Sequence, residues 1–128
     1  MIFLQIKKSA EFKEISSKGK KYHAQSLILL TFNTPEKYLQ DLTKNKKAKD
    51  FCRVGYTASK LVGGAVIRNL AKRRLREAFR KLFLKYAQNH FDYVIIAKKD
   101  IAKADFDKIL KDLEFCLKRI HENRAKTK

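Results

Sequence analysis

The segment 65–87 carries the strongest helical pattern in the chain. Apolar side chains recur there three or four residues apart, as they do on one face of an α-helix: Ala71, Leu75, Ala78, Phe79, Leu82 and Tyr86. A second edge of the same helix is polar and basic. We call this edge the cationic ridge and define it as Asn69, Lys72, Arg73, Arg76 and Arg80. A helix of this kind needs an apolar layer under its stripe and leaves a basic edge roughly 16 Å long in solvent.

The rest of the chain alternates short apolar runs with amphipathic ones. Strands are predicted at 26–32, 51–59 and 91–98. Further helices are predicted at 9–18, capped by Ser9, and at 106–121, capped by Asp105. Residues 33–50 form a lysine-rich loop with at most a helical turn at 37–42, and the charged tail 122–128 is expected to fray. The order α-β-β-α-β-α, with room for one further short strand, predicts an α+β fold. It is expected to be a single-domain α/β sandwich covering residues 1–128, with its core at about 7–121.

Two of these elements have informative faces. In the strand 51–59, Cys52, Val54, Tyr56 and Ala58 are expected to face the core, and the alternate residues form a polar face. In the helix 106–121 an apolar stripe includes Cys116, which is therefore expected to be a packed thiol. Phe115 projects from the opposite side. On the ridge helix, Glu77 is expected to pair with Lys81 or Arg73.

The charge of the chain narrows the class of partner. Lys and Arg number 31 against 13 Asp and Glu, which gives a net charge of +18, yet 45% of the residues are hydrophobic. A folded basic protein of this kind attracts polyanions, and nucleic acid is the expected partner rather than a membrane or a small molecule. A solvated basic surface without a partner is the alternative. No run is long enough to span a membrane, the N-terminal residues are a poor signal peptide, and only two cysteines occur. A cytoplasmic setting is expected.

Catalysis by the chain itself is not indicated. Its carboxylates are scattered or interleaved with lysine, and His23, His90 and His121 are isolated, so no catalytic residue and no metal ligand is expected. Gly63 and Gly64 lack the pattern of a nucleotide-binding P-loop. They permit either a tight strand-to-helix turn or a close approach of a nucleic-acid backbone to the helix N-terminus.

The ridge and its flanks form a longer motif. The run begins with Arg53-Val54-Gly55-Tyr56-Thr57-Ala58-Ser59-Lys60 and continues from Gly63-Gly64 through Arg68-Asn69-Leu70-Ala71-Lys72-Arg73-Arg74-Leu75-Arg76-Glu77 to Arg80. This run resembles the protein subunit of bacterial ribonuclease P, and the resemblance extends over about residues 7–120. It departs from the family pattern at Leu70, where the family has Arg, and at Gly64, where it has Asn. Ser16 and Leu30 stand at positions that are often aromatic.

The resemblance implies a fold and a role. The fold would contain a left-handed β-α-β crossover, and the protein would bind a catalytic RNA and help it remove the 5′ leader from precursor tRNA. The RNA, with its magnesium ions, would carry the chemistry, so the protein would bind no cofactor of its own. Contacts with the catalytic RNA are implied for Lys60, Arg68, Asn69, Lys72, Arg73, Arg76 and Arg80. A cleft for the leader is implied at Phe12, Arg53, Thr57 and Ser59.

Two other classes remain open at this point. A ribosomal or general RNA-binding protein could carry a similar basic helix, but it would not discriminate precursor from mature tRNA. A double-stranded DNA binder would place the basic helix in the major groove. Against that alternative, a strand and two glycines precede the ridge, where a helix-turn-helix protein would have another helix.

Overall fold

The computed structural model is built on one five-stranded sheet with the strand order β1-β4-β5-β3-β2. It describes residues 2–6, 19–36, 38–39 and 50–126. The strands are β1 (Ile2–Gln5), β2 (Lys20–His23), β3 (Leu27–Asn33), β4 (Phe51–Ala58) and β5 (Phe91–Ala97). The described helices of more than one turn are α3 (Ala65–Tyr86), the 3₁₀ helix η1 (Lys99–Lys103) and α4 (Phe106–Lys126).

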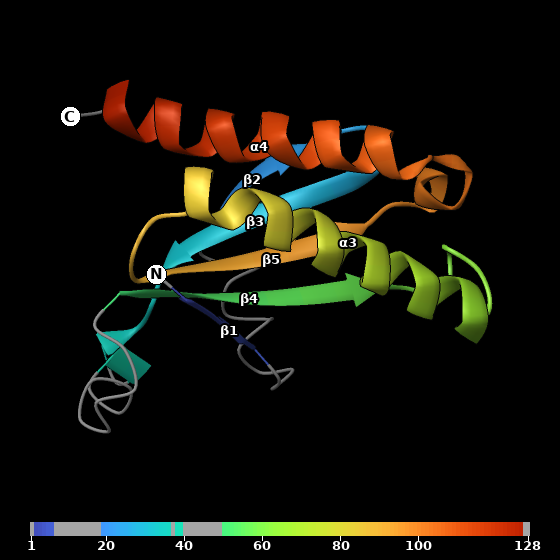
Figure 1. Cartoon of the computed structure of the whole chain (residues 1–128), viewed down its shortest axis with the longest axis horizontal. Helices are drawn as coiled ribbons and strands as arrows, with labels where there is room; N and C mark the ends of the chain where they lie inside the picture. Colours follow the sequence, from blue (N-terminus) through green and yellow to red (C-terminus); the bar gives the residue numbers. More distant parts are fainter. Residues whose placement is uncertain (1, 7–18, 37, 40–49, 127–128) are drawn as a thin grey trace.

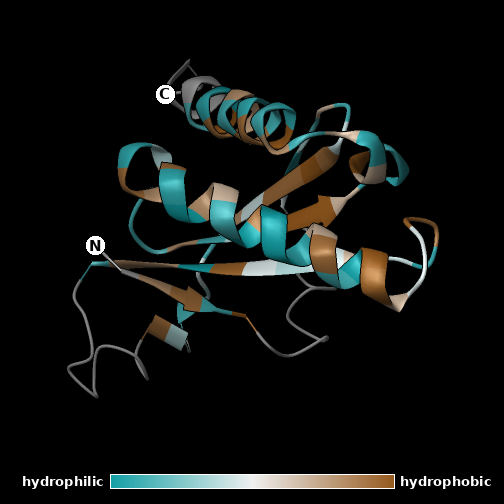
Figure 2. Cartoon of the chain, turned by 45° about the vertical axis from the view of Figure 1, so that its right-hand side comes forward, coloured by the Kyte–Doolittle hydropathy of each residue, from teal (hydrophilic) through white to brown (hydrophobic). Residues whose placement is uncertain are grey.

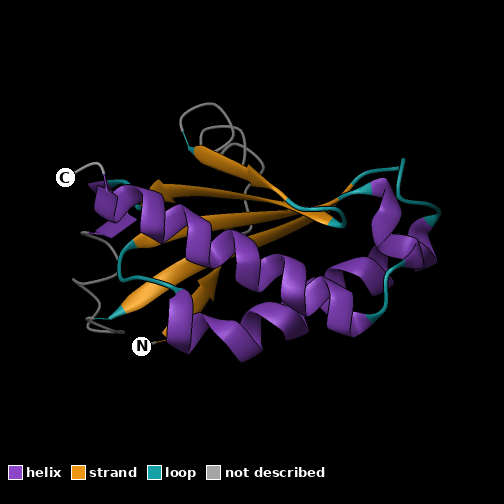
Figure 3. Cartoon of the chain, turned by 90° about the horizontal axis from the view of Figure 1, so that it is seen from above, coloured by secondary structure: helices purple, strands orange, loops and turns teal. Residues whose placement is uncertain are grey.

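The two long helices cover one face of the sheet. Helices α3 and α4 lie side by side on that face (Figures 1 and 3).

Strands β4 and β5 are parallel neighbours joined by α3, whereas β3 pairs antiparallel with both β5 and β2. In Figure 1, β4 and β5 both run to the right, β5 lies above β4, and α3 lies in front of them, so the β4-α3-β5 crossover is left-handed. Such crossovers are right-handed in nearly all proteins, and the expectation from the family resemblance is confirmed.

Aliphatic and aromatic side chains fill the layer between helices and sheet. Helix α3 contributes Leu75 and Phe79, both fully buried, and β5 contributes Tyr93. The stripe of α4 is buried as expected: Ile109, Leu113, Cys116, Leu117 and Ile120. A smaller cluster of Ile6, Leu30 and Val94 is buried on the opposite face of the sheet. The sheet thus carries apolar residues on both faces.

The predicted elements compare closely with the observed ones. The strands predicted at 26–32, 51–59 and 91–98 and the helices at 65–87 and 106–121 are confirmed to within a residue or two at most ends. Asp105 caps α4, because its Oδ1 accepts a hydrogen bond of 2.8 Å from the backbone N–H of Lys108. Two predictions were wrong. The described residues contain two additional strands, β1 and β2, where the prediction left room for one, and α4 continues to Lys126 instead of fraying after residue 121.

Some expectations fall on residues that are only partly described. The predicted helix 9–18, with Phe12 and Ser16, lies outside the described residues, as does most of the loop 33–50. At the start of that loop, the backbone N–H groups of Tyr38 and Leu39 donate to the carbonyl of Pro35, as in a helical turn. Within the part of the chain that the structure covers, no helix is both long and apolar enough to cross a membrane.

Candidate nucleic-acid interface

A tight turn sets the start of α3. Gly63 has a φ of 152°, and a Cβ atom at that position would lie 3.0 Å from the side chain of Ile67. Only glycine fits there without strain. The turn is closed by a hydrogen bond from Val62 N–H to the carbonyl of Ser59. The space around Gly64 is open, so the first turn of α3 is accessible from that side. The tight turn therefore explains the glycine at position 63. The open space at Gly64 leaves room for a nucleic-acid backbone to approach the helix N-terminus.

The cationic ridge lies on the outer side of α3, away from the buried stripe. Asn69, Arg73 and Arg80 are exposed, and Lys72 and Arg76 are half-buried. A surface hollow of about 540 Å³ opens among these side chains; it is lined by Val66, Asn69, Leu70, Lys72, Arg73 and Arg76. Because Ala71 and Leu75 point into the core from the same helix, the ridge is held on a rigid support. The structure therefore brings together most of the residues predicted to contact RNA.

Other predicted RNA contacts lie beside the ridge rather than on it. Arg68 is half-buried in the first turns of α3, and its Nε atom is buried and makes no hydrogen bond within the described residues. Lys60 is exposed in the turn before the helix. Glu77 was expected to pair with Lys81 or Arg73. It pairs instead with Arg80, with 3.6 Å between the guanidinium Nη1 and the carboxylate Oε1. An exposed pair of this kind leaves the Arg80 guanidinium accessible to other anions.

Tyr56 supports the ridge from below and was not singled out by sequence reasoning. Its ring lies under Arg76, with the guanidinium carbon 5.6 Å from the ring centroid. Burial raises the pKa of the Tyr56 phenol well above its ordinary value, and the neighbouring Arg76 offsets only part of that effect. The phenol is therefore neutral at physiological pH. An aromatic ring on the core face of a strand gives no sequence signal that distinguishes this position from ordinary core packing.

Arg53, predicted to line the leader cleft, lies in a buried ion pair. Only 7% of the residue is exposed, and its Nε donates to Asp92 Oδ1 at 2.8 Å. The Tyr38 ring stacks on the guanidinium at 4.4 Å, and Thr34 donates a further hydrogen bond to the same carboxylate. The polar face expected along this strand is not exposed at Arg53 and Gly55, which are both buried, whereas Val54 is buried as predicted. Arg53 can be buried because Asp92 on the adjacent strand neutralises its charge.

The remaining leader-cleft residues lie toward the end of β4. Thr57 is half-buried on the sheet face opposite to the helices, and Ser59 is exposed just after the strand. The hydroxyl of Ser59 accepts a hydrogen bond from the backbone N–H of Leu61 at 3.3 Å. Thr57 and Ser59 are thus accessible where Arg53 is not, and Phe12 lies outside the described residues.

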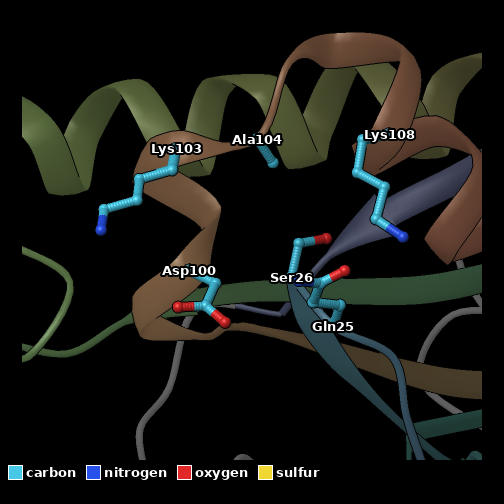
Figure 4. Close-up of a pocket in the computed structure, with 6 residues that line it drawn as sticks. All are labelled: Gln25, Ser26, Asp100, Lys103, Ala104 and Lys108. Atoms are coloured by element: carbon cyan, nitrogen blue, oxygen red, sulfur yellow. The ribbon is translucent and has the colours of Figure 1, made fainter.

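A separate polar pocket lies between η1, the start of α4 and the residues before β3. It has a volume of about 300 Å³ and is lined by Gln25, Ser26, Asp100, Lys103, Ala104 and Lys108 (Figure 4). Two of the lining residues bind the carboxylate of Asp112. Ser26 donates hydrogen bonds to it from both its backbone N–H and its Oγ, and Lys108 forms an ion pair with it at 3.1 Å. Burial opposes ionisation of Asp112, but the hydrogen bonds from Ser26 and Lys108 outweigh it and lower the pKa. This network fastens α4 to the sheet.

The two cysteines are buried, which confirms the packed thiol predicted at Cys116. Burial raises the pKa of Cys52 to about 12 and that of Cys116 to about 11. Thiols with such values stay protonated and are poor nucleophiles and metal ligands. Among the described residues, His, Cys, Asp and Glu side chains do not gather in groups of three or more that could hold a metal ion.

The fold is shared with solved ribonuclease P proteins. The chain is similar to the RNase P protein of Staphylococcus aureus, with a TM-score of 0.68 and 32% identity over 89% of this chain and 92% of that one. It also resembles the Thermotoga maritima protein, with a TM-score of 0.71 and 25% identity over 91% and 96% of the two chains. These likenesses define the class as small basic α+β proteins of ribonuclease P.

Sequence comparison narrows the class to a family. The family model described as ribonuclease P matches residues 3–121. The chain is 37% identical over 116 residues to the ribonuclease P protein component of Paramagnetospirillum magneticum, which covers 91% of this chain and 81% of that protein. It is 31% identical to the corresponding protein of Gluconacetobacter diazotrophicus over 90% and 89% of the two chains. The chain therefore belongs to the ribonuclease P protein family, and membership implies a role in tRNA 5′ processing together with an RNA subunit.

Proposed function

We propose that the chain binds the catalytic RNA of ribonuclease P and the 5′ leader of precursor tRNA, and so assists endonucleolytic removal of the leader. The cationic ridge is the observation that carries the proposal. Its arginines project from a rigid helix, and the planar guanidinium group holds phosphate oxygens in pairs. Family membership identifies the expected polyanion as the RNA subunit. The protein acts where that RNA acts, in the cytoplasm.

The division of labour follows from the kinds of side chain the protein offers. The two buried carboxylates among the described residues are engaged within the fold, Asp92 with Arg53 and Asp112 with Ser26. The protein supplies positive charge that lets two polyanions approach each other. In this proposal the RNA would hold the magnesium ions that supply metal-ion catalysis of the cleavage, and the protein's own residues would bind and position the RNA chains.

The leader is proposed to pass along the sheet face opposite to the helices. Thr57 and Ser59 present hydroxyl groups at the end of β4 that reach phosphate or ribose oxygens. Arg53 is a positioning residue in this account, because its ion pair with Asp92 fixes β4 against β5 just upstream.

Cleavage at low magnesium tests the division of labour. The catalytic RNA from the same genome is mixed with a leader-bearing tRNA precursor, with and without the protein, over a series of magnesium concentrations. The protein should lower the magnesium needed for cleavage and should favour the precursor over mature tRNA. Cleavage by the protein without RNA would refute the proposal. Equal binding of precursor and mature tRNA by the complex would instead support a general RNA-binding protein.

The salt dependence of RNA binding tests the ridge. In the double variant Arg73→Ala/Arg76→Ala, the fall of log K with log salt should become less steep. The magnitude of the slope should decrease by about 1–2 units, because two phosphate contacts are lost. The matched control Lys99→Ala/Lys111→Ala removes the same charge from exposed positions outside α3. If both double variants change the slope equally, the binding follows net charge and the ridge has no special role.

A further inference from the structure

The hollow on the ridge has an apolar floor. Val66 and Leu70 lie one helical turn apart and line the hollow together with the ridge side chains. Val66 is 82% exposed, which is unusual for an aliphatic residue on a helix that buries a full stripe elsewhere. Leu61 and Ile67 are also exposed nearby, and Figure 2 shows the hydrophobic residues at this end of α3 and in the turn before it. Folding does not account for this surface.

The surroundings of the floor indicate what covers it. Lys72, Arg73 and Arg76 line the same hollow, so whatever enters must carry negative charge close to an apolar surface. A single-stranded nucleotide has this combination, because its base has apolar faces and its phosphate is charged. In a duplex the base faces are stacked on one another and only base edges and backbone are accessible. The chemistry of the hollow therefore fits an unpaired nucleotide.

We propose that this hollow takes an unpaired nucleobase of the catalytic RNA. The base packs on Val66 and Leu70, the amide of Asn69 reaches its edge, and the neighbouring guanidinium groups hold the flanking phosphates. A cavity of about 150 Å³ admits a benzene ring, so a hollow of about 540 Å³ has space for a nucleobase. The inference rests on the proposed binding of the RNA subunit and adds a site of different chemistry to it.

Affinity measurements on the intact chain test the floor. The double variant Val66→Ser/Leu70→Ser should weaken binding of the catalytic RNA roughly tenfold, because apolar burial is lost. The slope of log K against log salt should stay as in the wild type, since no cation is removed. The control is Leu84→Ser, which alters an aliphatic residue that is 69% exposed near the other end of α3. It should bind the RNA like the wild type.

Site-directed crosslinking locates the contact independently of affinity. The chain has two cysteines, both buried, so Val66→Cys introduces its one exposed thiol. A photoreactive aryl azide attached there should crosslink to unpaired nucleotides of the catalytic RNA. Crosslinks confined to base-paired nucleotides would overturn the proposal. The same labelled protein is also crosslinked in an extract of the source cells, and crosslinks there to protein alone, with none to RNA, would overturn it too.

The outcomes separate this inference from the proposed function. If Arg73→Ala/Arg76→Ala lowers the salt slope while Val66→Ser/Leu70→Ser binds like the wild type, the protein binds RNA and the base site is wrong. If the arginine variant leaves the slope unchanged, the proposed use of the ridge fails first. An equal loss of affinity in Leu84→Ser would show a general effect of removing surface apolar groups, and would also overturn the assignment to the hollow.

Discussion

Arg53 and Asp92 form a buried ion pair between the neighbouring strands β4 and β5. Removing one partner of such a pair leaves an uncompensated charge in a low-dielectric site. Asp92→Ala should therefore lower the free energy of unfolding by about 3–5 kcal/mol. Urea unfolding at neutral pH measures the change. The control is Asp107→Ala, because Asp107 forms an exposed pair with Lys111 at 3.7 Å.

The control variant should change stability by less than about 0.5 kcal/mol, as exposed pairs do. A similar small effect for both variants would mean that Arg53 finds other compensation once Asp92 is lost. The charge of Arg53 would then be available to RNA, and its predicted contact with the leader would gain support. A large effect confined to Asp92→Ala fits the positioning role.

A second buried carboxylate, Asp112, makes the stability depend on pH. Burial has the largest single effect and raises its pKa, but the hydrogen bonds of Ser26 and Lys108 together lower the pKa in the folded protein below the ordinary value of 3.8. The bonds therefore stabilise the fold above the unfolded pKa, and their contribution is lost as the pH falls through the folded pKa. Ser26→Ala should reduce the free energy of unfolding by about 1–3 kcal/mol at neutral pH.

The difference between Ser26→Ala and the wild type should shrink as the pH is lowered below 4, because the protonated carboxyl no longer gains from the serine. Urea unfolding of both proteins over a pH series gives this difference directly. A difference that is constant with pH would show that Ser26 acts through packing and not through the charge of Asp112.

At the scale of elements, β1 depends on two rings of α3. Phe3 packs edge-on against Phe79 and Phe83, with ring centroids 5.5 and 4.6 Å apart. The strand is only four residues long and pairs with β4 alone, so it depends on packing contacts such as these in addition to its short hydrogen-bonded ladder. Phe3→Ala should release β1 and accelerate hydrogen exchange of the Ile6 amide, which donates to Val54. Amides in α4 should keep their protection, and a uniform loss in both elements would indicate global unfolding instead.

The same elements show which features are readable from the sequence. Helices α3 and α4 were predictable because their stripes repeat over about 20 residues, which fixes both the type of element and the buried face. Strand β1 was not, because four residues carry no period and its place is set by distant Phe79 and Phe83. Phe83 was missed in the stripe for a related reason: it is buried against Phe3, on the flank of the helix that faces β1.

The candidate site divides in the same way. The ridge was predictable, because helical spacing places Asn69, Arg73 and Arg76 on one edge whatever the rest of the fold does. The burial of Arg53 was not, because its partner Asp92 is 39 residues away and the pairing depends on the register of β4 and β5. The left-handed crossover is a property of how two strands and a helix are connected in space, and composition and periodicity carry no information about it.

At the scale of the whole molecule, the net charge of +18 sets stability and function against each other. Like charges on a small fold repel one another. At 0.1 M salt this repulsion is largely screened between exposed charges more than about 10 Å apart. Salt also weakens RNA binding, because releasing counterions gains less entropy when the bulk salt concentration is higher. The free protein should therefore become more stable as salt rises, while its affinity for the catalytic RNA falls.

Arg73→Ala tests this opposition in a single exposed residue. Removing one ridge cation should raise the free energy of unfolding at low salt by roughly 0.5 kcal/mol, since repulsion from Lys72, Arg76 and their neighbours is relieved. The gain in stability should vanish in molar salt, where the repulsion between exposed charges more than about 3 Å apart is largely screened. The same variant should bind RNA more weakly than the wild type at low salt. A variant that is less stable at low salt would mean that Arg73 is held by favourable contacts within the fold, and the ridge would then not be a surface kept charged for a partner.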